Sequence, residues 1–393
     1  MKQFARSVPV ILFMSFASLS LIALAGCSGG SGTIAPAAAK SIYAIQSSSN
    51  STTGIEQDSM LVFSASATGS ATPTSTLALP SGFFAYSIAV GAQGVIYVGG
   101  QQGNDTEYGV ILEYPAGSSG SATPNVTLNG SSAGTATFTW PDEIAVSSEG
   151  KLFVSSDDGS LETFASGFSA SSVPTQYLTW GENNFDDIGE AIGVDTAGDV
   201  FYADDDAIDV FAAGATGATA PTRTITGTDT NSFEDLFGMA VDGAGDVYVT
   251  NYNPTDDPAF PFARTNPGTS AASKRAHTTG PRAASRLTAH PHEANATFEP
   301  TEIIEFAAGA TGNAMPLKRI GGAATKIVEP FGLALDAVSN LYYADANDGY
   351  FTESNPAVLL EVFPSSATGN AGPAASLTST SFTFDNAVAV AIH

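Results

Sequence analysis

The chain has 393 residues and a formal net charge of −26, from 39 acidic and 13 basic residues. A field of this sign repels nucleic acid and anionic membrane surfaces, so we expect no nucleic-acid partner. Hydrophobic residues make up 43% of the chain, which is enough to bury a large core and argues against a disordered chain. Abundant Ser, Thr, Gly, Val and aromatic residues favour strands joined by turns.

The N-terminus has the charge pattern of a secretory signal peptide. Two basic residues, Lys2 and Arg6, precede an apolar stretch over residues 8–24, and the tetrapeptide LAGC then ends at Cys27. Two other interpretations of this pattern are an ordinary signal peptide with an incidental cysteine and an N-terminal membrane helix.

The tetrapeptide LAGC resembles the lipobox of bacterial lipoproteins. The resemblance implies cleavage before Cys27 and attachment of lipid to its sulfur. Cys27 is the only cysteine, so no internal disulfide can form. We therefore expect a signal peptide at 1–26, a flexible tether at 27–40, and a protein anchored in the bacterial cell envelope on its periplasmic or its extracellular side. The membrane is expected as a partner only through this anchor.

A short phrase recurs along the rest of the chain, most clearly as FAAGATGATAPTRTITG (211–227) and FAAGATGNAMPLKRIGG (306–322). Its opening aromatic residue is followed ten positions later by proline in six places. The pairs are Phe63 and Pro73, Tyr114 and Pro124, Phe164 and Pro174, Phe211 and Pro221, Phe306 and Pro316, and Phe363 and Pro373. We expect the aromatic residue to pack between repeats, and Gly and Pro to form turns.

Each phrase is preceded by an aromatic strand pattern such as GDVYVTN, and five of these by a small-residue pattern such as GMAVD. The sixth small-residue pattern stands at the C-terminus, as AVAVAIH (387–393). The small residues expected nearest the central axis are Ala89, Ala145, Gly193, Ala240, Ala334 and Ala389. Repeats of four short strands predict an all-β, six-bladed β-propeller over 41–393, with the C-terminal strand joining the N-terminal blade and closing the ring.

The repeats resemble the NHL-type repeat family of propellers. The closest units are DLFGMAVDGAGDVYVTN (235–251) and EPFGLALDAVSNLYYAD (329–345). The resemblance implies a propeller architecture and says little about activity, because such propellers include both binding modules and enzymes.

Residues 254–300 interrupt the fifth blade between its second and third strands. The segment contains five basic residues and three of the four histidines, and it has no alternating apolar pattern. We therefore expect an insertion and no seventh blade. It is either a solvated flexible loop or a mobile arm that meets an acidic surface or an anionic partner.

The loops that lead into the first strands of a propeller rim its central channel, and a ligand site is expected there. Three positions before each small axial residue stand Tyr86, Asp142, Glu190, Phe237, Phe331 and Asn386. Asp204 ends a second strand on the same face, and Trp140 and Trp180 fall in its loops. Aspartates at the end of the AVD or ALD patterns (Asp195, Asp242 and Asp336) are expected to cap turns.

Two ligands suit this channel mouth. A calcium ion could be held by oxygens of Asp142, Glu190, Asn386 and Asp204. A neutral ligand such as a carbohydrate could bind through Tyr86, Trp140, Trp180, Phe237 and Phe331. The third interpretation is that the carboxylates keep an acidic protein soluble and the aromatic residues only pack the blades.

The motifs favour a binding protein over an enzyme. No Gly-x-Ser-x-Gly nucleophile motif or His/Cys metal cluster occurs, and the only histidine outside the insertion is His393. The sequence therefore predicts a binding or scaffolding module with a protein or carbohydrate ligand. The alternative is a calcium-dependent hydrolase similar to gluconolactonase-type lactonases, which share this fold.

Overall fold

A computed structural model gives the fold. It describes residues 41–47, 58–103, 109–130, 138, 141–156, 160–179, 191–204, 207–226, 233, 235–252, 301–327, 330–345, 358–378 and 386–393. These residues form 24 strands in six antiparallel sheets of four strands each. Within the described ranges there is no helix with the length and hydropathy that a membrane crossing requires.

The first three blades carry the following strands, from the inner to the outer edge of each sheet. Blade 1 contains β24 (Asn386–Ile392), β1 (Ser41–Ser47), β2 (Ser59–Ser64) and β3 (Ser75–Ala78). Blade 2 contains β4 (Phe83–Val90), β5 (Ile96–Gln102), β6 (Gly109–Tyr114) and β7 (Val126–Asn129). Blade 3 contains β8 (Pro141–Val146), β9 (Leu152–Ser156), β10 (Leu161–Phe164) and β11 (Gln176–Leu178).

The other three blades follow the same plan. Blade 4 contains β12 (Ala191–Val194), β13 (Val200–Asp204), β14 (Ala207–Phe211) and β15 (Arg223–Ile225). Blade 5 contains β16 (Asp235–Val241), β17 (Val247–Tyr252), β18 (Glu302–Phe306) and β19 (Lys318–Gly321). Blade 6 contains β20 (Pro330–Leu335), β21 (Leu341–Asp345), β22 (Val358–Phe363) and β23 (Ala375–Thr378).

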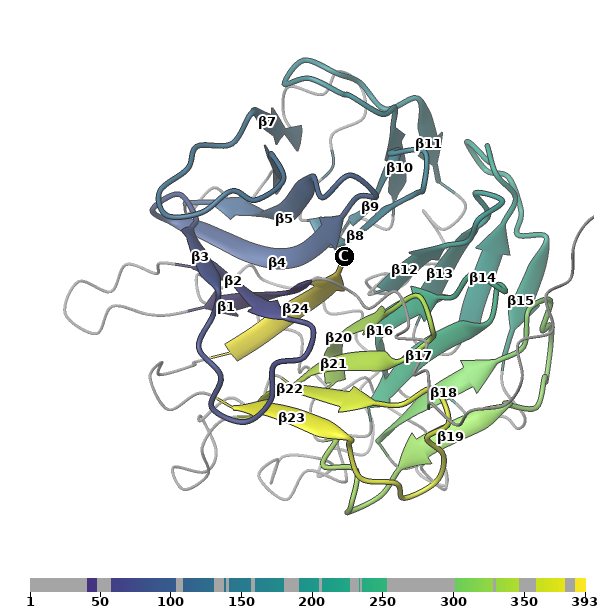
Figure 1. The fold of residues 1–393 in the computed structure, drawn as a ribbon. Coiled ribbons are helices and arrows are strands. Elements are labelled where there is room, and N and C mark those ends of the chain that lie inside the picture. The colour runs from purple at the N-terminus through teal and green to yellow at the C-terminus, as the bar shows by residue number, and fades with distance from the viewer. Residues whose placement is uncertain are drawn as a thin grey trace, which may run out of the picture. The chain divides into compact units, whose positions relative to one another are not determined.

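The inner strands β24, β4, β8, β12, β16 and β20 each contact the inner strands of both neighbouring blades, which closes a ring of six blades (Figure 1). The predicted six-bladed propeller is confirmed. Close approach explains the small residues near the axis: a Cβ atom on Gly193 would lie 2.6 Å from Val241 of the next blade. A larger side chain at this position would therefore push two inner strands apart.

The two ends of the chain complete the same blade. Strand β24 pairs with β1 (Figure 1), and Ser41 and His393 exchange two backbone hydrogen bonds of 3.0 and 3.1 Å. The ring is thus closed by the C-terminal strand, as the displaced AVAVAIH pattern predicts. The ring nitrogen Nε2 of His393 also lies 3.1 Å from the carbonyl oxygen of Ala92 in blade 2.

The core lies between neighbouring blades. The aromatic residue that opens each repeated phrase is fully or almost fully buried there; these residues are Phe63, Tyr114, Phe164, Phe211, Phe306 and Phe363. Phe306, for example, packs edge-to-face on Phe233, with ring centroids 5.7 Å apart. Each blade therefore depends on its neighbours for burial, which is typical of repeat proteins.

The repeated phrase also links each blade to the one before it. In five blades, a glycine stands six positions after the aromatic residue and makes two backbone hydrogen bonds with the outer strand of the preceding blade. Its carbonyl oxygen accepts one bond and its N–H donates the other. These glycines are Gly69, Gly120, Gly217, Gly312 and Gly369. Each has a φ angle between 54° and 64°. The two hydrogen bonds occupy the centre of an otherwise open sheet edge, which is how natural β proteins limit edge-to-edge association. Blade 3 carries Ala170 at this position and makes no such bridge among the described residues.

The connections of each blade lie on two faces, because the strands are antiparallel. We call the side with the links from first to second strands and from third to fourth strands (195–199 and 212–222 in blade 4) the turn face. The opposite side, with the links from second to third strands and between blades, is the mouth face. The end of β17 and the start of β18 lie on the mouth face, and the insertion 254–300 between them lies outside the described residues. The strands on either side of it, β17 and β18, pair in regular register.

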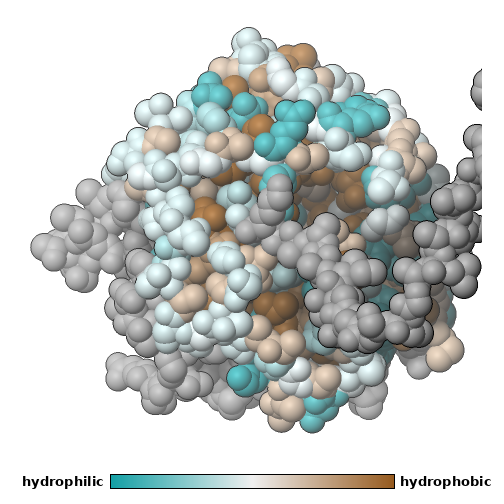
Figure 2. Space-filling model, in the orientation of Figure 1, coloured by the Kyte–Doolittle hydropathy of each residue, from teal (hydrophilic) through white to brown (hydrophobic). Residues whose placement is uncertain are grey.

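The surface is only weakly polar. On the side of the molecule drawn in Figure 2, most of the coloured surface is pale, and strongly hydrophilic residues form small separate patches. This agrees with a charged fraction of only 13%. Large hydrophobic side chains are exposed at Val173, Met315, Leu317 and Val338.

Candidate functional site

The first strands of five blades contain a β-bulge near the mouth face. Register shifts place Tyr86 in β4, Asp142 in β8 and Phe331 in β20 as the extra residue, and Phe237 with Gly238 opposite a single residue in β16. These are four of the positions that the sequence predicts at the channel mouth. Bulges are frequent beside binding sites because they turn a side chain out of the regular alternation of a strand.

The two remaining positions behave differently. In β24 the extra residue is Val388, whereas the predicted Asn386 lies two residues earlier and pairs with Ser47. In blade 4, Glu190 immediately precedes β12 and lies outside the described residues. In β24, Ala391 pairs with Tyr43 as Ala240 of β16 pairs with Tyr248, so Val388 stands three positions before the axial residue, as the other bulges do. The predicted axial Ala389 and mouth residue Asn386 are therefore wrong by two residues, because the sequence alone gives this strand no pairing partner to fix its alignment.

Two hydroxyl groups hold the bulges of blades 3 and 5. The backbone N–H of Gly238 donates to Thr250 Oγ1 at 2.7 Å, and this hydroxyl donates back to the Gly238 carbonyl at 3.4 Å. Ser155 makes the same pair of bonds with the backbone of Glu143, at 3.2 and 3.3 Å. A bulge disrupts the ladder, so these side chains replace backbone partners that the second strand no longer supplies. Thr250 and Ser155 stand at a position where the other second strands carry Gly, Ala or Ile. This change to a polar residue is the sequence signal that could have identified the two hydroxyl groups.

Hydrogen bonds with neighbouring elements stabilise the bulge of blade 2. Asp58, which is 1% exposed and precedes β2 of blade 1, accepts a 2.7 Å hydrogen bond from the backbone N–H of Ala85. The hydroxyl of Tyr86 donates to Oε1 of Gln101 at 2.9 Å, and Tyr86 itself is half-buried. On the other side, Ser87 donates to the carbonyl of Pro141 in blade 3 at 3.3 Å. Tyr86 is thus fixed in orientation while part of its ring stays accessible.

Asp142 and Phe237 are buried. Asp142 has no exposed surface, and Phe237 is 2% exposed. Phe237 therefore contributes to packing at its bulge, and it can meet a ligand only if neighbouring groups move. A second buried carboxylate, Glu162, accepts hydrogen bonds of 3.2 Å from both Ser156 and Ser160 at the mouth-face end of blade 3. Sequence reasoning missed this group.

Several predicted residues cannot be placed as side chains. Trp140, Trp180 and Glu190 lie outside the described residues, and for Asp204, Phe331 and Asn386 only the strand position is known. No group of three or more His, Cys, Asp or Glu side chains that could hold a metal occurs among the residues described. A calcium site at Asp142, Glu190, Asn386 and Asp204 thus stays a prediction.

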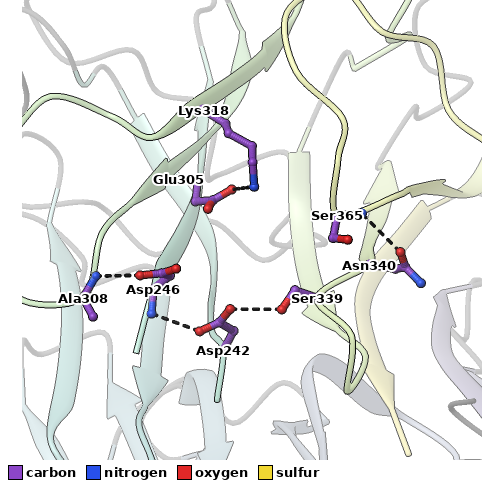
Figure 3. Close-up of polar contacts among 8 residues, drawn as sticks. All are labelled: Asp242, Asp246, Glu305, Ala308, Lys318, Ser339, Asn340 and Ser365. Carbon is purple, nitrogen blue, oxygen red and sulfur yellow. Dashed lines mark hydrogen bonds and ion pairs between the residues drawn. The ribbon is translucent and has the colours of Figure 1, made fainter. Parts of the chain in front are cut away.

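On the turn face, the predicted capping role of the aspartates is confirmed. Oδ1 of Asp242 accepts the backbone N–H groups of Ala244 and Asp246 at 2.8 and 3.0 Å, and Asp195 and Asp336 make equivalent bonds in blades 4 and 6. The same turn ends with a second carboxylate, Asp246 in blade 5. Its Oδ1 accepts a hydrogen bond of 2.7 Å from the backbone N–H of Ala308, in the link between the third and fourth strands (Figure 3). These carboxylates serve local turns and are not arranged to hold a ligand.

Comparison with solved structures finds similar chains at low sequence identity. No family model matches the chain, and no curated protein matches it. It is similar to a protein of unknown function from Bacteroides caccae, with a TM-score of 0.52 and 9% identity over 90% of this chain and 98% of that one. The WD40 β-propeller domain of Doa1 aligns with a TM-score of 0.40 and 8% identity, over 74% of this chain and 85% of that domain. At these identities, the similarity concerns the fold alone.

Proposed function

We propose that this protein is an exported, lipid-anchored β-propeller of the NHL type that acts as a binding or scaffolding module at the bacterial cell envelope. The observation that carries the binding role is the set of bulges at the mouth-face ends of the inner strands. Five blades place a residue there that departs from regular strand geometry, around one axis. A propeller that served only as a spacer would not need this repeated departure.

Within this proposal, the accessible part of the mouth is the Tyr86 region. Its ring is half-buried and its hydroxyl is held by Gln101, so it offers a pre-oriented aromatic face and a polar edge. This combination suits a neutral ligand such as a carbohydrate, or a side chain of a partner protein. The negative net charge of the chain disfavours anionic ligands.

Binding is tested with the full-length lipoprotein in detergent. Envelope polysaccharides and envelope protein fractions are offered to the wild type and to the variant Tyr86→Ala. We expect retention of one ligand by the wild type and at least about tenfold weaker retention by the variant. Met315→Ala, at an exposed position on the turn face outside any proposed site, is the matched control and should bind like the wild type. Equal retention by Tyr86→Ala would contradict a site at this bulge.

The anchor is tested separately. A Cys27→Ser variant should appear in the soluble envelope fraction, whereas the wild type should sediment with membranes, because acylation of Cys27 is proposed to be the only attachment. Membrane retention and normal processing of the variant would contradict the lipoprotein proposal while leaving the binding proposal intact.

A calcium-dependent, lactonase-like hydrolase is the second candidate, and the buried carboxylate of Asp142 at its bulge favours it. Carboxylate oxygens are the ligands that calcium prefers in proteins. If calcium binds there, adding it should raise the melting temperature of the wild type, and Asp142→Asn should remove that rise. A melting temperature independent of calcium in the wild type would contradict this candidate.

A further inference from the structure

A cavity of about 260 Å³ opens on the turn face between blades 3 and 4. Its floor is Phe153, which is 4% exposed, and its walls include Lys151, Gln176 and Asp195. It lies on the face opposite the bulges, so it is a different site from the channel mouth. Its volume is close to that of a single sugar residue and below that of typical drug-sized pockets.

The internal repeat identifies the residues of blades 4 and 5 that correspond to those lining the cavity. Strand register aligns Phe153, Thr163 and Gln176 across blade 3. The equivalent row in blade 4 is Phe201, Val210 and Arg223, and that in blade 5 is Tyr248, Glu305 and Lys318. We call these three sets the aromatic rows.

In blade 4 a long cation from the outer strand covers the aromatic ring, and in blade 5 a cation of the outer strand pairs with the middle strand. Arg223 stacks over Phe201, with its guanidinium carbon 5.3 Å from the ring centroid. Lys318 reaches across its row to Glu305 with an ion pair of 2.5 Å (Figure 3). In blade 3 the outer residue is the shorter, neutral Gln176, and no cation covers Phe153 from this strand.

A second filling group is also missing from the blade 3–4 groove. Between blades 5 and 6, the hydroxyl of Ser339 donates to Oδ2 of Asp242 at 3.0 Å and closes the groove at the turns (Figure 3). The equivalent residues beside the cavity are Gly198 and Ser147. Both replacements are shorter, so neither side chain closes the groove at this boundary.

The walls of the cavity are pre-formed. Oδ1 of Asp195 accepts the N–H groups of Ala197 and Asp199 at 2.9 Å each, and Asp199 in turn accepts from Ala213 at 2.9 Å. These bonds fix both turns of blade 4 that border the cavity. Ligand binding would therefore not carry the entropy cost of ordering these turns.

The chemistry of the lining selects a neutral, polyhydroxylated ligand. Lys151 is paired with Glu149 at 3.0 Å, and Asp195 leaves the wall with one net negative charge, which disfavours an anionic ligand. Ser148 and Thr196 supply exposed hydroxyl groups and Gln176 supplies an amide, which are donors and acceptors suited to hydroxyl groups. Phe153 offers an apolar surface for the C–H face of a sugar ring. We infer that the cavity between blades 3 and 4 is a binding site for one neutral sugar residue.

The site is tested by ligand-observed NMR with the full-length protein in detergent. The probes are glucose, galactose and mannose, with glucuronate as a charged comparator. We expect saturable binding of at least one neutral hexose and weaker binding of glucuronate. No saturable hexose binding, or tighter binding of glucuronate, would overturn the inference.

Two variants fill the cavity in ways that this chain already uses. Gln176→Arg places on Phe153 the stacking that Arg223 makes on Phe201, and Gly198→Ser copies Ser339, which shares the left-handed backbone region. Each should weaken hexose binding at least about tenfold. Gln176→Arg should melt like the wild type, whereas Gly198→Ser should melt at a lower temperature because its backbone keeps a positive φ. The control Arg223→Gln, at the next boundary, should leave the affinity of the cavity unchanged. Unchanged binding by folded Gln176→Arg and Gly198→Ser proteins would overturn the site, and this result is independent of any result with Tyr86→Ala.

Discussion

Ser339 of blade 6 donates a hydrogen bond of 3.0 Å to Oδ2 of Asp242 in blade 5 (Figure 3). Ser339 has a φ angle of 59°, where blades 2 to 5 carry glycine in the same turn. A non-glycine residue in this region costs about 1 kcal/mol. The bond to a carboxylate offsets this cost and joins two blades at the same time.

Replacement of Ser339 separates these two contributions. Ser339→Ala keeps the strained backbone and loses the hydroxyl, so we expect a loss of about 1 kcal/mol in the free energy of unfolding. Ser339→Gly loses the hydroxyl but relieves the backbone, and it should lie within ~0.5 kcal/mol of the wild type. Chemical denaturation measures both. A glycine variant as unstable as the alanine variant would show that backbone strain plays no part.

The hydroxyl that holds the blade 5 bulge should be essential to it. Thr250→Val preserves the side-chain shape but leaves the N–H of Gly238 without its 2.7 Å acceptor, at a buried position. We expect a destabilisation of ~1–3 kcal/mol, and near-complete recovery in Thr250→Ser. The measurement is urea unfolding of the three proteins. Equal stability of the valine and serine variants would mean that the methyl packing, and not the hydroxyl, supports the bulge.

Replacing a glycine that bridges two blades should reduce stability through backbone conformation alone. Gly312 has a φ angle of 54°, and a Cβ atom there would meet no atom within 4 Å. Gly312→Ala should therefore lower stability by about 1 kcal/mol through φ, without any clash. The matched control is Gly243→Ala, since Gly243 also has open space but no positive φ. It should change stability by less than ~0.5 kcal/mol. Identical effects of the two substitutions would refute this explanation.

Blade 2 carries a buried hydroxyl where the other five blades carry phenylalanine. Tyr114 is fully buried, and its hydroxyl makes no hydrogen bond with any part of the chain that the structure describes. Burial raises the pKa of Tyr114 to about 12. Because an unsatisfied buried hydroxyl is costly, Tyr114→Phe should stabilise the protein by ~1 kcal/mol in thermal and chemical unfolding. A clear loss of stability would reveal a partner in the remaining part of the chain.

Glu361 makes stability depend on pH. Its side chain is fully buried, and Oε2 has no hydrogen-bond partner among the residues described. Oε1 has only the hydroxyl of Ser376, at 3.5 Å. Burial raises the pKa of Glu361 from 4.5 to about 7, although the nearby Lys326 and the Ser376 hydroxyl act in the opposite direction.

The direction of the pH effect follows from the raised pKa. The folded state binds the proton of Glu361 more tightly than the unfolded state. The contribution of this proton to the free energy of unfolding is therefore fully present at low pH, and it is lost as the pH rises from about 4.5 through 7. Glu361→Gln cannot ionise, and it should exceed the wild type in unfolding free energy by ~2 kcal/mol at pH 8 but not at pH 4.5. Parallel pH profiles for the two proteins would be inconsistent with this assignment.

The sequence alone was sufficient for the architecture because the aromatic–proline spacing and the strand patterns repeat in every blade. It also identified the positions of four bulges, since it counted from the small axial residues. It could not show that Phe237 is buried at its bulge, because burial depends on the neighbouring blade. The role of Gly312 as a bridge was missed for a similar reason: the contact joins two repeats, whereas a single repeat shows only a turn.

The closure of blade 1 has a consequence for how the chain can fold. Five blades consist of strands that follow one another, so each can form from local hairpins. Blade 1 needs β1 and β24, which stand at opposite ends of the sequence, and its formation carries the largest loop-closure entropy in the molecule. Ring closure is therefore the natural slow step, and a newly made chain reaches its native state only after its last seven-residue strand has been synthesised.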